Sequence, residues 1–394
     1  MTQCLLDPKF GYYTTRDPLN STKGDFITSP EISQTFGEIC GIWYFSNFIK
    51  QLENQLKLNI NSVDIHKRIF RIIEFGPGRG TLINDILKIL NKFVDKNNPI
   101  EIVLIEKSDV LIQCQYEMLC DKHDNKFNKI DEFTFESVSK WGNKITWLKD
   151  DFPNLNKSKE YINLVMCHEF FDALPINRFI KTEDGWIEQM IDITNQNTNT
   201  TTSIIKGKPT QTPPFQFVLQ KSVNCNIPCK IEKFQKLPLN SSIELCPIAT
   251  RYIQLISDLI KSSNLSSGLI IDYGTLTTPM NSLRGIQNHQ FVNPLLDPGN
   301  IDLSIDVDFG SLIENIENTN VLKTCFTSQA NWLNLMGLGY RIDQLISFEK
   351  NDFKKDQIIK SYKRLIDVGF NGMGKLFNVL AIYDSKHDKP PGFP

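Results

Sequence analysis

The sequence lacks a charge excess of either sign, a long apolar run and a cysteine framework. Its 394 residues carry 43 Lys and Arg against 45 Asp and Glu, so no basic excess favours a nucleic-acid partner. No apolar run approaches the ~18 residues of a membrane span, so we expect no membrane-spanning segment. With 40% hydrophobic and 22% charged residues, the composition is typical of a globular protein with a sizeable core.

The nine cysteines are odd in number, and no two of them have the C-x-x-C spacing of a zinc ribbon or a thioredoxin site. Reduced thiols are therefore expected, as in a protein of the cytosol or the mitochondrial matrix. The zinc motif H-E-x-x-H is also absent, because Asp172 stands where a second histidine would follow His168 and Glu169. We expect no metal site.

The sharpest motif is IIEFGPGRGT at 72–81, where a β-branched run ends in Glu74 and the glycines Gly76, Gly78 and Gly80 before a helical period. Glycines let backbone N–H groups approach a ligand at a helix N-terminus. An NAD fingerprint would need glycine at Thr81, and a Walker A loop is absent. The spacing fits an S-adenosylmethionine (SAM) loop, in which Glu74 would hold the ammonium end of the methionine part. The alternative is a structural glycine turn.

Further strands are predicted at EIVLIEKS, KITWL, YINLVMCHEFF and GLIIDYG, with helices between them. This alternation predicts an α/β, Rossmann-like SAM-dependent methyltransferase fold, a doubly wound sheet with inserts. Glu106, at the end of the second strand, is predicted to accept the ribose hydroxyls, with a solvated carboxylate as the alternative. At the end of the third strand we expect Asp150, or its neighbour Asp151, to flank the adenine.

The fourth strand ends in the string CHEFFDALP, at the strand end that faces the transferred methyl in a doubly wound sheet. SAM and a guanidinium are both cationic, and two such charges about 4 Å apart repel by about 4 kcal/mol at an effective dielectric constant of about 20. Carboxylates remove that cost. We therefore predict that Glu169 or Asp172 clamps an arginine. His168 is the candidate that accepts its proton, with a core histidine bonded to the backbone as the alternative.

Other strings give weaker signals. The amino-methyltransferase pattern [DNS]-P-P-[YF] is nearly matched by TPPF at 212–215, but no strand precedes it, so no chemistry is assigned there. Asp272 and Tyr273 close the fifth strand and are expected on the substrate side. The loop-rich stretch that holds Arg284 and Asp306 has no periodic face, which hints at a site.

The domain organisation follows from these strings. The stretch GDFITSPEISQTFGE is expected either to form a lid or to cap a helix that begins at Ser29. We expect a lid and helical segment over 1–64, a methyltransferase core over 65–275 with a polar insertion at about 192–214, a substrate-side insert over 276–320, a C-terminal completion of the core over 321–384, and a disordered tail over 385–394.

Five strings in one order carry a family resemblance: GDFITSPEISQTFGEICGIW, IIEFGPGRGTL, CHEFFDALP, LRGIQNHQFVNPLLDPGNIDLSIDVDF and MGKLFNVLA. With them the chain resembles the MidA-like family from about Gly11 to Ile382. The resemblance implies a SAM-dependent protein-arginine methyltransferase that acts as a mitochondrial complex I assembly factor. Its acceptor would be an arginine on a core matrix-arm subunit, taken to the symmetric dimethyl form. The glycine loop would be the cofactor site.

One departure from the family pattern concerns the N-terminus. Family members have a presequence and a first helix before the DPKFGYY-like segment, whereas this chain opens at Met1 close to it, so we expect a truncated start. The mitochondrial matrix is implied by the resemblance alone. Two alternatives stay open at this point: a methyltransferase of a small-molecule acceptor, and a SAM-binding assembly chaperone without catalysis.

Overall fold

A computed structural model describes the chain over residues 1–19, 24–25, 27–57, 68–121, 127–194, 204–205, 208–209, 213–370 and 372–394. Five parallel strands form the centre of its main sheet. They are β1 (Ile69–Phe75), β2 (Ile100–Ile105), β5 (Lys144–Leu148), β6 (Tyr161–His168) and β13 (Ser267–Thr275). Four of them, all but β5, are largely buried apolar runs, as a sheet covered on both faces favours.

The order of these strands reverses in the middle of the sheet. β2 and β5 lie on one side of β1, and β6 and β13 lie on the other. Ile73 of β1 is in register with Val103 of β2 and Val165 of β6. In a doubly wound sheet, ligands bind outside the carboxyl ends of the strands at such a reversal.

Antiparallel strands extend the sheet at both edges. β19 (Phe377–Asp384) pairs with β13 and with β18 (Leu322–Ser328), so the C-terminal part of the chain completes one side. On the other side, β4 (Thr134–Val138) pairs with β5, and β3 (Asn128–Lys129) pairs with β4. The short β17 (Val307–Asp308) pairs with β13.

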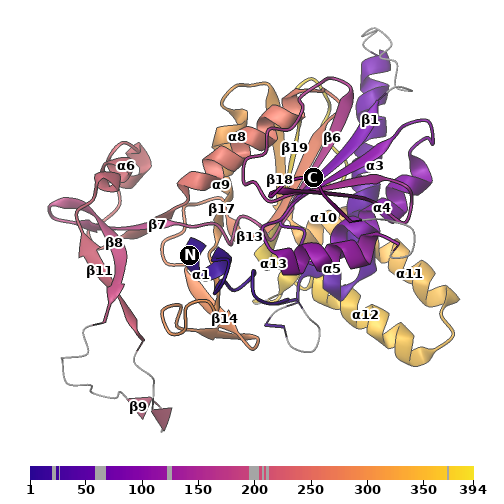
Figure 1. The fold of residues 1–394 in the computed structure, drawn as a ribbon. Helices are drawn as coiled ribbons and strands as arrows, with labels where there is room; N and C mark the ends of the chain where they lie inside the picture. Colours follow the sequence, from indigo (N-terminus) through magenta and orange to yellow (C-terminus); the bar gives the residue numbers. More distant parts are fainter. Residues whose placement is uncertain are drawn as a thin grey trace.

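Helices cover both faces of the sheet (Figure 1). On one face, Phe70 and Ile72 share a core with α3 (Gln34–Lys57), α4 (Thr81–Phe93), α5 (Asp109–Leu119), α10 (Gln329–Leu335), α11 (Leu338–Phe348) and α12 (Asp352–Ile366). On the other face, Ile73 and Phe75 pack with α8 (Pro247–Lys261) and α9 (Phe309–Glu317). The predicted doubly wound α/β fold is confirmed.

Two smaller sheets are inserted into this core. The first joins β7 (Asn177–Thr182), β8 (Gly185–Ile193), β11 (Phe215–Gln220) and β12 (Ser242–Leu245), and it projects from the main body beside η2 (Val223–Cys225), α6 (Asn226–Cys229) and α7 (Glu232–Gln235) (Figure 1). The second joins β14 (Arg284–Gln287), β15 (Gln290–Val292) and β16 (Asp302–Ser304).

Short elements complete the description: α1 (Thr2–Leu6), α13 (Met373–Leu376) and the pair β9 (Ile204–Ile205) and β10 (Lys208–Pro209). The last pair belongs to the polar insertion expected at about 192–214, most of which lies outside the described residues. No helix in the described part of the chain is long and apolar enough to cross a membrane.

Two local expectations differ from the structure. The helix expected from Ser29 is two helices, α2 (Ser29–Ile32) and α3, because Ser33 between them has an extended backbone and its hydroxyl accepts from the N–H of Thr35 at 3.3 Å.

Residues 385–394, expected as a disordered tail, are packed instead. The Trp43 indole donates to the carbonyl oxygen of Pro391 at 2.9 Å, and Phe393 is only 9% exposed.

Candidate active site

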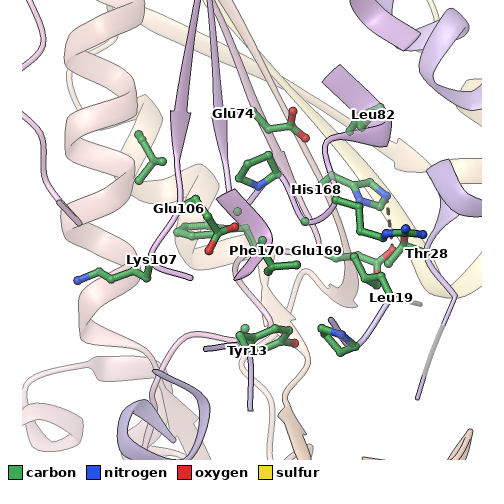
Figure 2. Close-up of a pocket in the computed structure, with 18 of the residues that line it drawn as sticks. Tyr13, Leu19, Thr28, Glu74, Leu82, Glu106, Lys107, His168, Glu169 and Phe170 are labelled. Carbon is green, nitrogen blue, oxygen red and sulfur yellow. Dashed lines mark ion pairs between the residues drawn. The ribbon is translucent and has the colours of Figure 1, made fainter. Parts of the chain in front are cut away.

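A cavity lies where β1, β2 and β6 end, at the reversal of the strand order (Figure 2). It is closed on one side by N-terminal residues that include Tyr13, Leu19 and Thr28. Figure 2 shows Glu106 and Lys107 on one side of the cavity and His168 and Thr28 on the other. Six of the sequence-predicted site residues line it: Glu74, Gly76, Gly78, Glu106, His168 and Glu169.

The glycine loop after β1 adopts a backbone that side chains rarely allow. Gly76, Gly78 and Gly80 have φ angles of 62°, 55° and 83°, all in the left-handed region. A Cβ on Gly78 would stand 2.8 Å from the side chain of Leu19, so the loop also lacks room for one. Gly80 does not line the cavity; it is the N-cap of α4, and its N–H donates to Pro77. Its role is to turn the chain into the helix.

Glu74 is a buried acid without a partner. Glu74 is the penultimate residue of β1 and is 2% exposed. Its Oε2 has no hydrogen-bond partner among the described residues. Burial, and then the charge of Glu106, raise the pKa of Glu74 to about 8. A buried carboxylate of this kind is stabilised by a cation that enters the cavity.

Glu106 is held by the N-cap and one side chain of the helix that follows it, α5. Its carboxylate accepts from the N–H of Ser108 at 2.9 Å and from the side-chain amide of Gln115 at 3.2 Å. Burial raises the pKa of Glu106 to about 7, against the lowering effect of these hydrogen bonds. The same amide of Gln115 donates to the carbonyl oxygen of Gly78 at 2.7 Å. Gln115 was not predicted from the sequence. A polar residue on the apolar face of the helix α5 is the signal that could have identified it.

Of the two adjacent acids after β5, the second faces the cavity. Asp150 is exposed, does not line the cavity, and accepts only a local hydrogen bond from the N–H of Phe152 at 3.0 Å. Asp151 does line it, where its carboxylate pairs with Lys107 at 2.7 Å and accepts from the Tyr252 hydroxyl at 3.0 Å. The expectation that Asp150 flanks a ligand therefore transfers to Asp151, because neighbouring loop residues point in different directions.

At the end of β6 the side chains of His168 and Glu169 face each other. Glu169 has a φ of 49°, a strained conformation for a residue with a side chain, and its N–H donates to Ile271 at 2.9 Å. Its Oε1 lies 3.5 Å from Nε2 of His168, drawn as a dashed line in Figure 2. Neither atom has a hydrogen-bond partner among the described residues.

The protonation of this pair follows from burial. Burial lowers the pKa of His168 to about 3, so the imidazole is neutral at pH 7. Burial, and then the charge of Asp172, raise the pKa of Glu169 well above its usual range. The assignment of His168 as a proton acceptor is disfavoured on this ground, since a base with so low a pKa binds a proton poorly near neutral pH.

Asp172 lies outside the cavity lining but close behind it. Its Oδ2 accepts from the Tyr273 hydroxyl and from the Ser304 hydroxyl, the latter at 3.2 Å, while Oδ1 is buried without a partner among the described residues. Asp272 fixes this turn, since its carboxylate accepts from the backbone N–H groups of Phe171 and Asp172 at 3.0 and 3.3 Å. Asp272 and Tyr273 of the fifth strand thus hold the turn that carries Asp172, and neither of them lines the cavity.

The residues present fit SAM. An unpartnered buried carboxylate at Glu74 suits an ammonium group, a left-handed glycine loop leaves room for close backbone approach, and a second acid follows on the neighbouring strand at Glu106. No group of three or more His, Cys, Asp or Glu in the described ranges could hold a metal ion.

Comparison with known proteins agrees with this geometry. A family model described as "Putative S-adenosyl-L-methionine-dependent methyltransferase" matches residues 48–326. The mouse protein arginine methyltransferase NDUFAF7, mitochondrial, is 32% identical over 385 residues, which cover 97% of this chain and 79% of that protein. The human protein of the same name is 31% identical over 385 residues, 97% of this chain and 78% of its own length.

A more distant relative and a solved structure extend the comparison. The Drosophila melanogaster homologue of NDUFAF7 is 31% identical over 393 residues, 97% of this chain and 80% of that protein. A COG1565 superfamily member from Burkholderia thailandensis, crystallised with S-adenosyl-homocysteine, superposes with a TM-score of 0.69 at 19% sequence identity. The match covers 99% of this chain and 88% of that one, so the two share a fold.

Proposed function

The chain belongs to this family of SAM-dependent methyltransferases, the one its motifs predicted, and on that premise we propose that it methylates arginine on a protein. The acceptor that we propose is a core matrix-arm subunit of complex I, the product is symmetric dimethylarginine, and the compartment is the mitochondrial matrix. The names of the mouse, human and fly relatives support arginine and the mitochondrion. The acceptor subunit and the symmetric product rest on the motif resemblance.

One observation carries the choice of a cationic acceptor. Glu169 Oε1 and Asp172 Oδ1 are buried carboxylate oxygens without hydrogen-bond partners among the described residues, and they lie at the end of β6 beside the cavity. An arginine side chain is a planar cation with five N–H donors, which is the group that two such oxygens fit. A neutral acceptor would not stabilise their ionised forms, whereas a cation would.

The proposed roles in cofactor binding follow the strand ends. Glu74 would hold the ammonium of SAM, the backbone at Gly76 and Gly78 would lie against its methionine part, and Glu106 would accept its ribose hydroxyls. Asp151, which lines the cavity, would flank its adenine. When bound, SAM supplies a methyl group on a cationic sulfur, and transfer leaves a neutral thioether.

The chain's own residues would then handle the acceptor and its proton. An arginine between Glu169 and Asp172 favours their ionised forms, because a nearby cation lowers the pKa of a carboxyl. The pair orients one guanidinium nitrogen toward the methyl and offsets the repulsion between the two cations. The nitrogen loses a proton as the N–C bond forms. We assign that proton to Glu169, whose raised pKa makes it the better acceptor than His168.

The experiment that tests this function is a methyl-transfer assay on the full chain. Purified protein is incubated with SAM labelled in the methyl group and with isolated complex I core subunits, and the labelled residue is identified by mass spectrometry. We expect label on arginine as the symmetric dimethyl form. Label on a residue other than arginine, or no transfer while SAM is bound, would refute the proposal.

A further inference from the structure

Tyr13 touches both ends of the proposed site. Its ring lines the cavity, and in Figure 2 it lies below Phe170 and Glu169. Its carbonyl oxygen accepts from the Ser108 hydroxyl at 2.6 Å, two residues after Glu106 on the cofactor side. Its phenol donates to Asp302 at 2.8 Å on the other side. One residue of the N-terminal segment therefore joins the cofactor side to the first residue of β16.

Asp302 belongs to a buried group of acids. It is 4% exposed, and the charges of Asp172, after β6, and of Asp25, in the N-terminal segment, act on it. Tyr13 acts on it through its hydrogen bond. The charge of Asp302 acts in turn on Glu169 and on Tyr12. The cation that acts on Asp172 is Arg284 of β14, which is paired with Asp306 at 2.7 Å. Carboxyl groups therefore outnumber cations around this group.

We propose that Tyr13 and Asp302 are positioning residues that complete the acceptor site. Tyr13 forms the wall between the cofactor and the acids, and Asp302 accepts from its phenol and adds a third buried carboxyl group to those of Glu169 and Asp172. The N-terminal segment and the insert that carries β16 thus both contribute to selecting a cationic acceptor. This inference rests on the proposed function, since an arginine acceptor is what the added charge would select.

The hydrogen bond between the two residues has a measurable electrostatic effect. Burial and the charge of Asp172 raise the pKa of Asp302 to about 7, and the bond from Tyr13 opposes this rise because it stabilises the ionised carboxylate. Replacing Tyr13 with phenylalanine keeps the ring and removes the donor. The pKa of Asp302 then rises further, so a larger fraction of the acid is neutral near pH 7 and the acceptor is bound less well.

The test compares Tyr13→Phe with Tyr12→Phe. Tyr12 is the matched control, because its buried hydroxyl also donates to an aspartate, Asp25 at 2.5 Å, but its side chain does not line the cavity. Transfer to complex I core subunits is measured from pH 6 to pH 9, and SAM binding is measured by calorimetry. For Tyr13→Phe we expect SAM affinity within about twofold of wild type, at least tenfold lower kcat/KM for the acceptor at pH 7, and an acid limb moved to higher pH.

A second variant separates charge from folding. Asp302→Asn keeps the size of the side chain but cannot ionise. We expect it to bind SAM as wild type does and to lower kcat/KM for the acceptor at least tenfold. Adding Tyr13→Phe to Asp302→Asn should then cause no further shift of the pH profile. The inference is overturned if Tyr13→Phe matches Tyr12→Phe in both kcat/KM and pH profile. If wild type itself transfers no methyl to arginine, the proposed function fails, and this inference fails with it.

Discussion

The side-chain amide of Gln115 donates to the carbonyl oxygen of Gly78 at 2.7 Å and thereby ties α5 to the glycine loop. Gln115 is fully buried, and its other hydrogen bonds reach Glu106 at 3.2 Å and, at its Oε1, the Trp147 indole of β5 at 3.0 Å. This one side chain thus bonds to residues in or directly after three neighbouring parallel strands, β1, β2 and β5. The two loops proposed to hold SAM are held together by it.

Gln115→Leu should weaken SAM binding by about 10- to 100-fold, because the glycine loop and Glu106 lose a shared donor and each lost hydrogen bond to a buried group costs about 1–3 kcal/mol. Isothermal titration calorimetry measures the change. Gln113→Leu on the exposed face of the same helix is the control, and it should bind SAM as wild type does. Equal affinities of the two variants would remove Gln115 from the site.

Gly78→Val should abolish SAM binding. The backbone at Gly78 has a φ of 55°, which a β-branched side chain rarely adopts, and a Cβ there meets the Leu19 side chain at 2.8 Å, so either the loop or Leu19 must shift. Gly142→Ala is a matched control for backbone strain, since Gly142 has a φ of 85° but open space around it and lies away from the cavity. The control should lose about 1 kcal/mol of stability without losing SAM affinity. Binding retained by Gly78→Val would contradict the cofactor assignment.

SAM binding should strengthen as the pH rises from 6 to 7.5. The pKa of Glu74 is raised to about 8, so at pH 6 the carboxyl is protonated and must lose its proton to bind an ammonium. The affinity should rise by up to about tenfold per pH unit, since one proton is released at this site. The range stops at pH 7.5 because an α-amino group itself titrates near pH 8.

Calorimetry in two buffers of different ionisation enthalpy counts the protons released at each pH. Glu74→Gln is the comparison variant: it should bind SAM more weakly, and its affinity should vary less with pH, because Glu106, whose pKa is raised to about 7, still titrates. A wild-type affinity that is flat between pH 6 and pH 7.5 would show that Glu74 is already ionised in the free protein.

Glu169→Gln should keep SAM binding within about twofold and reduce methyl transfer by at least 100-fold, because the amide neither compensates a guanidinium charge nor accepts its proton, and losing a positioned base alone costs about 10²–10⁴ in rate. Single-turnover transfer of labelled methyl measures it. Glu183→Gln, in the exposed turn between β7 and β8, is the control and should transfer normally. Transfer by Glu169→Gln at the wild-type rate would exclude Glu169 from the mechanism.

Much of the fold could be predicted because its signals are local. The run from Ile72 to Thr81 carries a strand, three glycines and a helix start within ten residues, and each step follows from the residues themselves. The position of Glu169 followed equally from the end of an apolar strand. The direction in which each of two adjacent side chains points could not be predicted locally. Asp150 and Asp151 carry the same carboxyl group, and only the packing of their loop decides which one faces the cavity.

Features made by distant contacts could not be predicted. Tyr13 and Asp302 are 289 residues apart in the chain, and neither stands in a pattern that points to the other. The same holds for the packed C-terminus, where Trp43 meets Pro391 across 348 residues. A proline-rich ending reads as disordered by composition, yet the fixed backbone of proline lowers the entropy lost when such a segment packs.

The place of β19 in the main sheet bears on how the protein is made. β19 spans Phe377–Asp384 and lies between β13 and β18, which both precede it in the chain. β18 can therefore join the sheet only after β19 has formed. A nascent chain therefore exposes the edge of β13 until β19 has emerged from the ribosome, and open strand edges pair with other chains. We expect the main sheet to close only after β19 has emerged, and chaperones to bind the chain before that point.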